Sequence, residues 1–173
     1  MAALLTGLPP SVRAGCRVLV LGSMPGDASL QAARYYAHPR NRFWPLMASL
    51  CGFAVDMPYE ARMHSLHDAG VGLWDVIGRC ERRGSLDASI VRGSEVANPV
   101  ADLLVAHRSI EAIALNGGKA AEAFRRHVEP KLSQAHRPAL LTLPSTSPAN
   151  AAFQHERLRA AWDVLAPFLR ARG

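Results

Sequence analysis

The sequence predicts an α/β fold, in which one three-layer α/β/α domain is built around a four-stranded, mainly parallel central sheet. Four short runs of aliphatic residues have the composition of buried strands. Helical patterns separate these runs, and such alternation is typical of a parallel sheet covered on both faces. No repeat, linker or break in composition divides the chain, so we expect residues 1–173 to form a single domain.

The expected strands are short and rich in Leu, Ile and Val. The first lies at 17–22 and the second at 71–77, where the sequence reads VGLWDVI. The third and fourth lie at 110–115 and 139–143. A basic, glycine-containing loop is expected at 78–87, directly after the second strand.

The expected helices alternate with these strands and begin or end at helix-terminating residues. They lie at 42–51, 58–70, 98–107, 117–128 and 151–170. Asn98 and Pro99 favour a helix start, because an Asn side chain caps free N–H groups and proline suits the first helical position.

Four loops follow the carboxyl ends of the expected strands, where open α/β folds bind their ligands. They contain GSMPG at 22–26, WDVIGRC at 74–80, LNGGKA at 115–120 and LPSTSPAN at 143–150. We therefore expect the functional residues in these four segments.

The chain carries a formal net charge of +6, and 18 of its 20 basic residues are arginine. The planar guanidinium group suits phosphate, so a polyanionic partner is one explanation of this charge. A basic surface without such a partner is the other.

Several classes of protein are disfavoured by what the sequence lacks. No apolar run reaches the roughly 18 residues of a membrane span, and the first residues do not resemble a signal peptide, so we expect a soluble cytoplasmic protein. Cys16, Cys51 and Cys80 are too few and too scattered for a four-cysteine metal site. His64 and His67 share a helix face but have no further ligand at matching spacing, so we expect neither a metal nor a cofactor.

The segment 36–44, YAHPRNRFW, concentrates aromatic, arginine and amide side chains. Aromatic faces stack on bases, arginines bind phosphates, and an amide can hold a water molecule or contact a base edge. In the alternative interpretation, Phe43 and Trp44 are core residues and Asn41 caps the following helix.

Taken together, these motifs resemble the uracil DNA glycosylase superfamily. In its mismatch-specific uracil glycosylases, a GINPG-type loop precedes an F-A-H-P-x-N-R-F-W string, which GSMPG and YAHPRNRFW resemble here. GLWDVI, LNGGKA and LPSTSPAN extend the resemblance over about 18–162. The last motif, with the missing catalytic asparagine of the first loop, points to the hypoxanthine (deoxyinosine) glycosylases.

The resemblance implies roles for several residues of the base pocket. Met24 occupies the position of the asparagine that activates water in the mismatch-specific enzymes, and it cannot do so. Asn41 is then expected to hold the attacking water, as the catalytic residue, and Tyr36 to stack on the flipped base. We also place Ser23, Met24, Asp75 and Asn116 in the base-binding set.

A second set of residues is expected to contact DNA. It comprises Arg40, Arg42, Ser145, Thr146 and Ser147. Leu143 stands where uracil glycosylases carry a His or Asn, so the group that would steady a departing uracil is missing. The final loop could instead be an ordinary capping turn before the last helix.

Asp75 has two open interpretations. An ionised carboxylate accepts hydrogen bonds only, so it could take the N1–H of hypoxanthine and reject adenine, whose N1 is an acceptor. Alternatively, Asp75 caps a turn or pairs with Arg79. The arginines at 79, 82 and 83 are expected either beside the groove, where they would meet phosphates, or in a solvated surface loop.

These expectations describe a monomeric, monofunctional DNA glycosylase that hydrolyses the bond between hypoxanthine and deoxyribose. No lysine falls in the expected pocket, so water is the expected nucleophile. Its partner would be DNA that contains deaminated bases. A uracil or broad-specificity glycosylase, and a nucleic-acid-binding relative without catalysis, are the alternatives.

Overall fold

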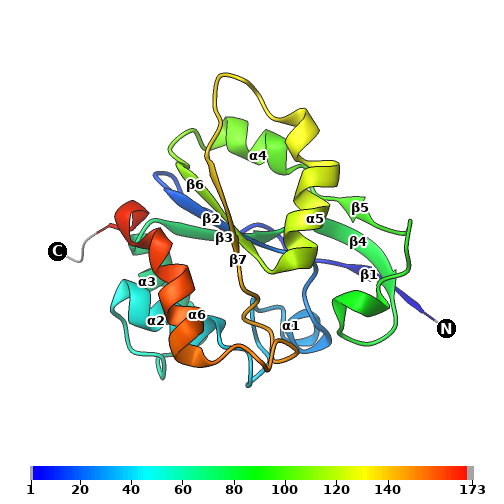
Figure 1. The fold of residues 1–173 in the computed structure, drawn as a ribbon, viewed down its shortest axis with the longest axis horizontal. Coiled ribbons are helices and arrows are strands. Elements are labelled where there is room, and N and C mark those ends of the chain that lie inside the picture. The colour runs from blue at the N-terminus through cyan, green and yellow to red at the C-terminus, as the bar shows by residue number, and fades with distance from the viewer. Residues whose placement is uncertain (1, 171–173) are drawn as a thin grey trace.

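A computed structural model, described here for residues 2–170, contains a four-stranded parallel sheet at its centre (Figure 1). The strand order is β3-β2-β6-β7, and all three neighbouring pairs are parallel. The strands are β2 (Val18–Gly22), β3 (Val71–Asp75), β6 (Ala112–Asn116) and β7 (Ala139–Leu143). The predicted α/β class and the four predicted central strands are confirmed, with β6 beginning two residues later than expected.

Helices cover both faces of this sheet, because alternate strand residues point to opposite sides. Val18 and Val20 pack with the helices α2 and α3, with α6 and with the 3₁₀-helix η3. Leu19 and Leu21 pack on the other face with α4 and α5. The helices of the first face are α2 (Phe43–Cys51), α3 (Tyr59–Asp68), α6 (His155–Trp162) and η3 (Asp163–Phe168), and those of the second are α4 (Val100–Ala106) and α5 (Gly118–His127).

A second, antiparallel sheet extends one side of the molecule (Figure 1). It has the order β1-β4-β5, with β1 (Ala3–Thr6), β4 (Ile77–Arg82) and β5 (Val96–Ala97). The prediction of a loop over 78–87 is therefore wrong for its first five residues. Alternation of burial along β4 explains the strand, since Ile77, Cys80 and Arg82 are buried while Arg79 and Glu81 are exposed.

The chain passes from one sheet to the other at a single residue, Val76. The Val76 N–H donates to the Gly22 carbonyl, and the Ile77 N–H donates to the Ser23 carbonyl, at 2.9 Å each. The apolar run VGLWDVI thus supplies two strands rather than one, and β3 ends at Asp75 beside the loop after β2.

Several helix ends differ from the prediction for local reasons. The last helix, expected over 151–170, is an α-helix only to Trp162, and the 3₁₀-helix that follows contains Pro167, which lacks an N–H for α-helical bonding. A short helix, α1 (Asp27–Ala32), was not predicted in the Gly/Pro/Ser stretch after β2. The 3₁₀-helices η1 (Asp87–Ser89) and η2 (Glu129–Lys131) were also unforeseen.

Asn98 does not cap α4 as predicted. The helix starts at Val100, and the Asn98 Nδ2 group donates instead to the Asp75 carbonyl at 2.8 Å. This bond fastens the end of β3 to the segment before α4. Within residues 2–170, no helix combines the length and the apolar character needed to cross a membrane.

Candidate active site

A groove of about 1130 Å³ lies at the carboxyl ends of the parallel strands. Its lining comes from the loops that follow β2, β6 and β7, from the end of β3, and from the segment around η1. Every site residue predicted from the sequence except Arg42 lines this groove. The topology therefore gathers residues that are more than 120 positions apart in the chain, such as Ser23 and Ser147.

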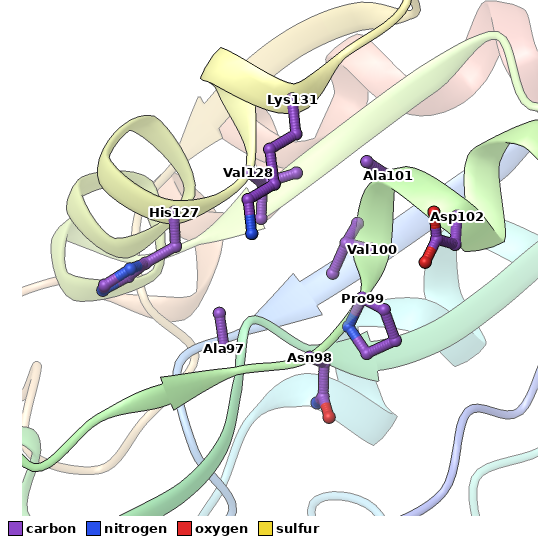
Figure 2. A pocket seen from close by; sticks show the side chains of 9 residues that line it. All are labelled: Ala97, Asn98, Pro99, Val100, Ala101, Asp102, His127, Val128 and Lys131. Atoms are coloured by element: carbon purple, nitrogen blue, oxygen red, sulfur yellow. The ribbon is translucent and has the colours of Figure 1, made fainter.

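A second, smaller hollow of about 200 Å³ lies between the start of α4 and the end of α5 (Figure 2). Its ionisable lining residues are Asp102, His127 and Lys131, and it shares no residue with the groove. Among residues 2–170, no group of three or more His, Cys, Asp or Glu side chains is arranged to hold a metal ion. The predicted chemistry thus belongs to the groove.

Asn41 lies in the groove at the start of α2. Its Oδ1 accepts a hydrogen bond at 2.9 Å from the N–H of Phe43, the first residue of α2, although the N-cap position of that helix is Arg42 and not Asn41 as the capping interpretation has it. Its Nδ2 group donates to no atom of residues 2–170, although the side chain is only partly exposed. This hydrogen bond fixes the amide orientation and leaves the NH₂ group available to a substrate.

Tyr36 also lines the groove, in a left-handed backbone conformation with φ of 54°. Its ring stacks on Phe43 with centroids 3.9 Å apart and planes 21° apart, so one ring face is covered. The hydroxyl accepts a hydrogen bond from Asn116 Nδ2 at 3.3 Å. Burial, with the nearby Asp75, raises the pKa of this hydroxyl well above its usual range, so Tyr36 stays protonated at neutral pH.

Asn116 joins β6 to the loop after β7. Its Oδ1 accepts the Thr146 N–H at 3.0 Å, and its Nδ2 donates to Thr146 Oγ1 at 3.1 Å. Thr146 is fully buried. This burial argues against the predicted phosphate contact of Thr146 and favours a role in holding the loop.

Arg42 lies outside the groove lining and binds the loop after β7. Its guanidinium donates to the carbonyls of Phe153 and Asn150, the latter at 2.9 Å, and to that of Ser147 at 3.4 Å. These bonds occupy donors that a phosphate would need, so the structure favours a positioning role for Arg42 over the predicted phosphate contact. Without Arg42, these three backbone carbonyls would need water or another hydrogen-bond donor.

The other predicted DNA contacts are at the groove surface. Arg40 is exposed, and Ser145 and Ser147 are partly exposed. Both serine hydroxyls accept backbone N–H groups within the loop, from Ser147 at 3.1 Å and from Ala149 at 3.2 Å. Their own O–H protons remain available, since a hydroxyl can accept and donate at once.

Met24 and Ser23 form the wall that follows β2. Met24 is 6% exposed and belongs to the core on the face of the sheet that α4 and α5 cover, so it offers apolar surface only. Ser23 Oγ donates to Asp87 Oδ1 at 2.6 Å. Asp87, from η1, is a groove residue that the sequence interpretation missed.

The arginines that were expected beside the groove differ in exposure. Arg79 and Arg83 are exposed, but Arg82 is fully buried. Its guanidinium donates to the Gly84 carbonyl at 2.6 Å and to Asp27 Oδ1 at 3.4 Å. The expectation that Arg82 meets DNA is therefore wrong, because its side chain holds the segment before η1 from within.

Asp75 ends β3 and is only 5% exposed. No ion pair with Arg79, or with any other residue of 2–170, involves its carboxylate. Burial and the neighbouring Asp87 raise the pKa of Asp75 to about 7, while Arg82 opposes this shift. The alternative prediction of an Asp75–Arg79 pair is therefore wrong.

The comparison with known proteins gives one consistent result. The family model described as "Uracil DNA glycosylase superfamily" matches residues 9–166. A protein of Methanosarcina acetivorans named Hypoxanthine DNA glycosylase is 34% identical over 160 residues, which are 92% of this chain and 96% of that protein. Its namesake in Methanosarcina barkeri is 34% identical over 117 residues, 67% of this chain and 73% of that one.

A solved structure is similar over nearly the whole chain. It is the solution NMR structure of a Methanosarcina acetivorans protein described as a candidate uracil DNA glycosylase. The two folds superpose with a TM-score of 0.79 at 30% sequence identity, over 95% of this chain and 97% of the other.

Proposed function

Because this chain belongs to the uracil DNA glycosylase superfamily, we propose that its groove receives a single hypoxanthine base flipped out of DNA. The chain is a DNA glycosylase, an enzyme that hydrolyses the bond between a base and its deoxyribose. The observation that carries the choice of base is the 34% identity, over 92% of this chain, to a relative named Hypoxanthine DNA glycosylase.

The proposed reaction has two parts, capture of the flipped base and hydrolysis of its bond to the sugar. Extrusion of a base costs a few kcal/mol and is easiest for mispaired bases, which favours inosine in mismatches or single strands. Phe43 covers one face of the Tyr36 ring, and the flipped base stacks on the other face. Asn41, fixed by its bond to the Phe43 N–H, directs its NH₂ group at the attacking water or at the sugar's developing charge.

Uracil is the second candidate, because the solved relative is described as a candidate uracil DNA glycosylase. The lining of the groove argues against it as the preferred base. Met24 and Leu143 are buried apolar residues at the two groove positions where the resemblance places polar groups in uracil glycosylases.

The deciding experiment compares matched oligonucleotides that contain one inosine or one uracil, in duplex and in single-stranded form. The purified enzyme is incubated with each, and abasic sites are revealed by cleavage with alkali. Release of hypoxanthine well ahead of uracil supports the proposal, whereas preferential release of uracil refutes it. A single domain, a monomer and a cytoplasmic location remain part of the proposal, and sizing of the protein with and without DNA tests the monomer.

The stacking role of Tyr36 predicts a specific pattern of loss. Tyr36→Ala should weaken binding of the flipped base by about 1–3 kcal/mol, the usual worth of a base stacked on an aromatic ring. Tyr36→Phe keeps the ring and loses only the bond from Asn116, so it should cost less than the alanine change. Affinity for DNA with an uncleavable inosine analogue measures both. Equal damage by the two variants would show that the hydroxyl is the working group.

The exposed arginines predict the salt dependence of DNA binding. With Arg42 and Arg82 committed to internal bonds, Arg40, Arg79 and Arg83 remain free to meet phosphates. Three phosphate contacts give a slope of about −2.7 for log affinity against log salt, from about −0.9 per contact. Arg40→Gln should make this slope shallower by about 0.9 in a titration with duplex DNA. A slope that Arg40→Gln leaves unchanged would remove Arg40 from the interface.

A further inference from the structure

The carboxyl group of Asp75 is buried at the end of β3, in the lining of the groove. Its Oδ2 atom is completely buried and has no hydrogen-bond partner in residues 2–170. Its Oδ1 lies against Gly22, only 2.4 Å from the point that a Cβ atom there would occupy. Gly22 is the register partner of Asp75 across β2 and β3, so the absence of a side chain at Gly22 makes room for this carboxyl group.

The charged and titratable groups around Asp75 come from three other segments. Asp87 faces it from η1, Arg82 from β4, and the hydroxyls of Tyr35 and Tyr36 from the loop before α2. Arg82 makes no ion pair with Asp75 in residues 2–170. Its Nε and Nη2 atoms donate to Gly84 and Asp27, and its buried Nη1 atom has no hydrogen-bond partner there.

Of the two acidic groups, Asp87 is better placed to keep the negative charge. Burial raises the pKa of Asp87 too, but the Ser23 hydroxyl donates to its carboxylate at 2.6 Å, and Arg82 and Lys119 favour its ionised form. Asp75 receives no such hydrogen bond. At neutral pH a large share of Asp75 therefore carries a proton, consistent with its pKa of about 7.

A purine leaves more readily once a ring nitrogen has accepted a proton or a hydrogen bond, so a proton donor in the groove would assist the proposed reaction. Asn41 and Met24 have no acidic proton to give. Burial holds the pKa of Tyr36 far too high for it to serve at neutral pH. A useful general acid has a pKa close to the working pH.

We propose that protonated Asp75 is the general acid that donates its proton to N7 of the departing hypoxanthine. This inference rests on the proposed function. As the proton moves to N7, the C1′–N9 bond breaks and its electron pair goes to the purine, which leaves as neutral hypoxanthine. Water then adds to C1′, and the proton that it loses returns to the Asp75 carboxylate, so that the enzyme is restored.

This role differs from that of an ionised Asp75 that accepts the N1–H of the base. The two roles predict opposite responses to pH. A general acid must be protonated, so the rate should fall as pH rises through about 7. An ionised acceptor must be deprotonated, so the rate should rise over the same interval.

The experiment measures single-turnover excision of inosine from duplex DNA between about pH 5.5 and 9. The wild-type rate should fall about tenfold per pH unit above pH 7, since each unit removes nine-tenths of the remaining acid. Asp75→Asn should be slower by about 100- to 10,000-fold at pH 6. Its rate should also lack the fall above pH 7, which we call the alkaline limb of the pH profile. Affinity for an uncleavable inosine analogue should change little. Asp87→Asn should move the limb to lower pH, because it removes the charge that raises the pKa of Asp75.

A folding control accompanies these rates. Folding raises the pKa of Asp75, so its contribution to the free energy of unfolding decreases as pH rises from about 4 to 7. At pH 8, Asp75→Asn should therefore melt no lower than the wild type. A rate that rises through pH 7, or an alkaline limb that persists in Asp75→Asn, overturns the general-acid role. Wild-type enzyme that releases no hypoxanthine at any pH would instead refute the proposed function.

Discussion

Replacement of Asn41 by alanine is expected to slow inosine excision by about 100- to 1,000-fold, equivalent to roughly 2.7–4 kcal/mol of transition-state stabilisation. The reason is that its NH₂ group is a preoriented donor in the groove, with the amide oxygen fixed on the Phe43 N–H at 2.9 Å. Single-turnover kinetics on inosine DNA measure the loss, and the affinity for the uncleavable analogue should stay within about threefold of wild type.

The hydrogen bond that Asn41 accepts at the start of α2 must be separated from catalysis. Asn41→Ala also removes the acceptor for the Phe43 N–H, which costs about 0.5–2 kcal/mol of stability. Asn41→Ser is the matched control, because serine is a good capping residue and has no amide group. If the serine variant keeps near wild-type activity, Asn41 acts through the helix start and not through its NH₂ group.

Replacement of Trp162 by alanine is expected to lower the free energy of unfolding by about 3–5 kcal/mol. Trp162 is fully buried at the end of α6, where its ring belongs to the core under the parallel sheet. Its Nε1–H also donates to the Pro144 carbonyl at 2.9 Å, which ties the loop after β7 to that core. Urea denaturation followed by circular dichroism measures the loss.

Trp162→Phe distinguishes packing from the hydrogen bond. Phenylalanine keeps much of the buried ring but leaves the Pro144 carbonyl without this donor, at a cost of about 1–3 kcal/mol. If the two variants unfold at the same urea concentration, the bond to the loop accounts for the whole effect. A loss below about 1 kcal/mol for Trp162→Ala would contradict its assignment as a core residue.

The sequence predicted the parallel sheet because strands that are buried on both faces are short, nearly continuous runs of aliphatic residues. β2 and β6 are aliphatic up to their last residues, Gly22 and Asn116. β4 could not be predicted in this way, because Arg79, Glu81 and Arg82 interrupt its apolar residues. Only the fold shows that Arg82 is buried with carbonyl and carboxylate partners, which composition alone does not reveal.

The sequence predicted the residues that line the groove better than the residues that hold its loops in place. Asn41, Tyr36 and Asp75 come from segments whose composition indicates chemistry, and all three line the groove. Arg42 is equally suggestive in sequence, but its direction depends on the loop that it meets more than 100 residues later. Asp87 was missed because an acidic residue in a basic segment indicates a groove residue only once β4 has brought η1 beside Ser23.

The wall formed by η1 has a consequence for how enzymes of this shape diversify. This segment lies at the end of the small antiparallel sheet, and it meets the loop after β2 through Ser23–Asp87 and through the Asp27 N–H, which donates to Ser85 Oγ at 2.9 Å. Most of its residues are exposed, so insertions or replacements there leave the main core intact. Variation over 85–89 can therefore change which bases are accepted while Asn41 and the Asn116–Thr146 contact stay in place. A library randomised at these five positions offers a direct route to glycosylases for other damaged bases.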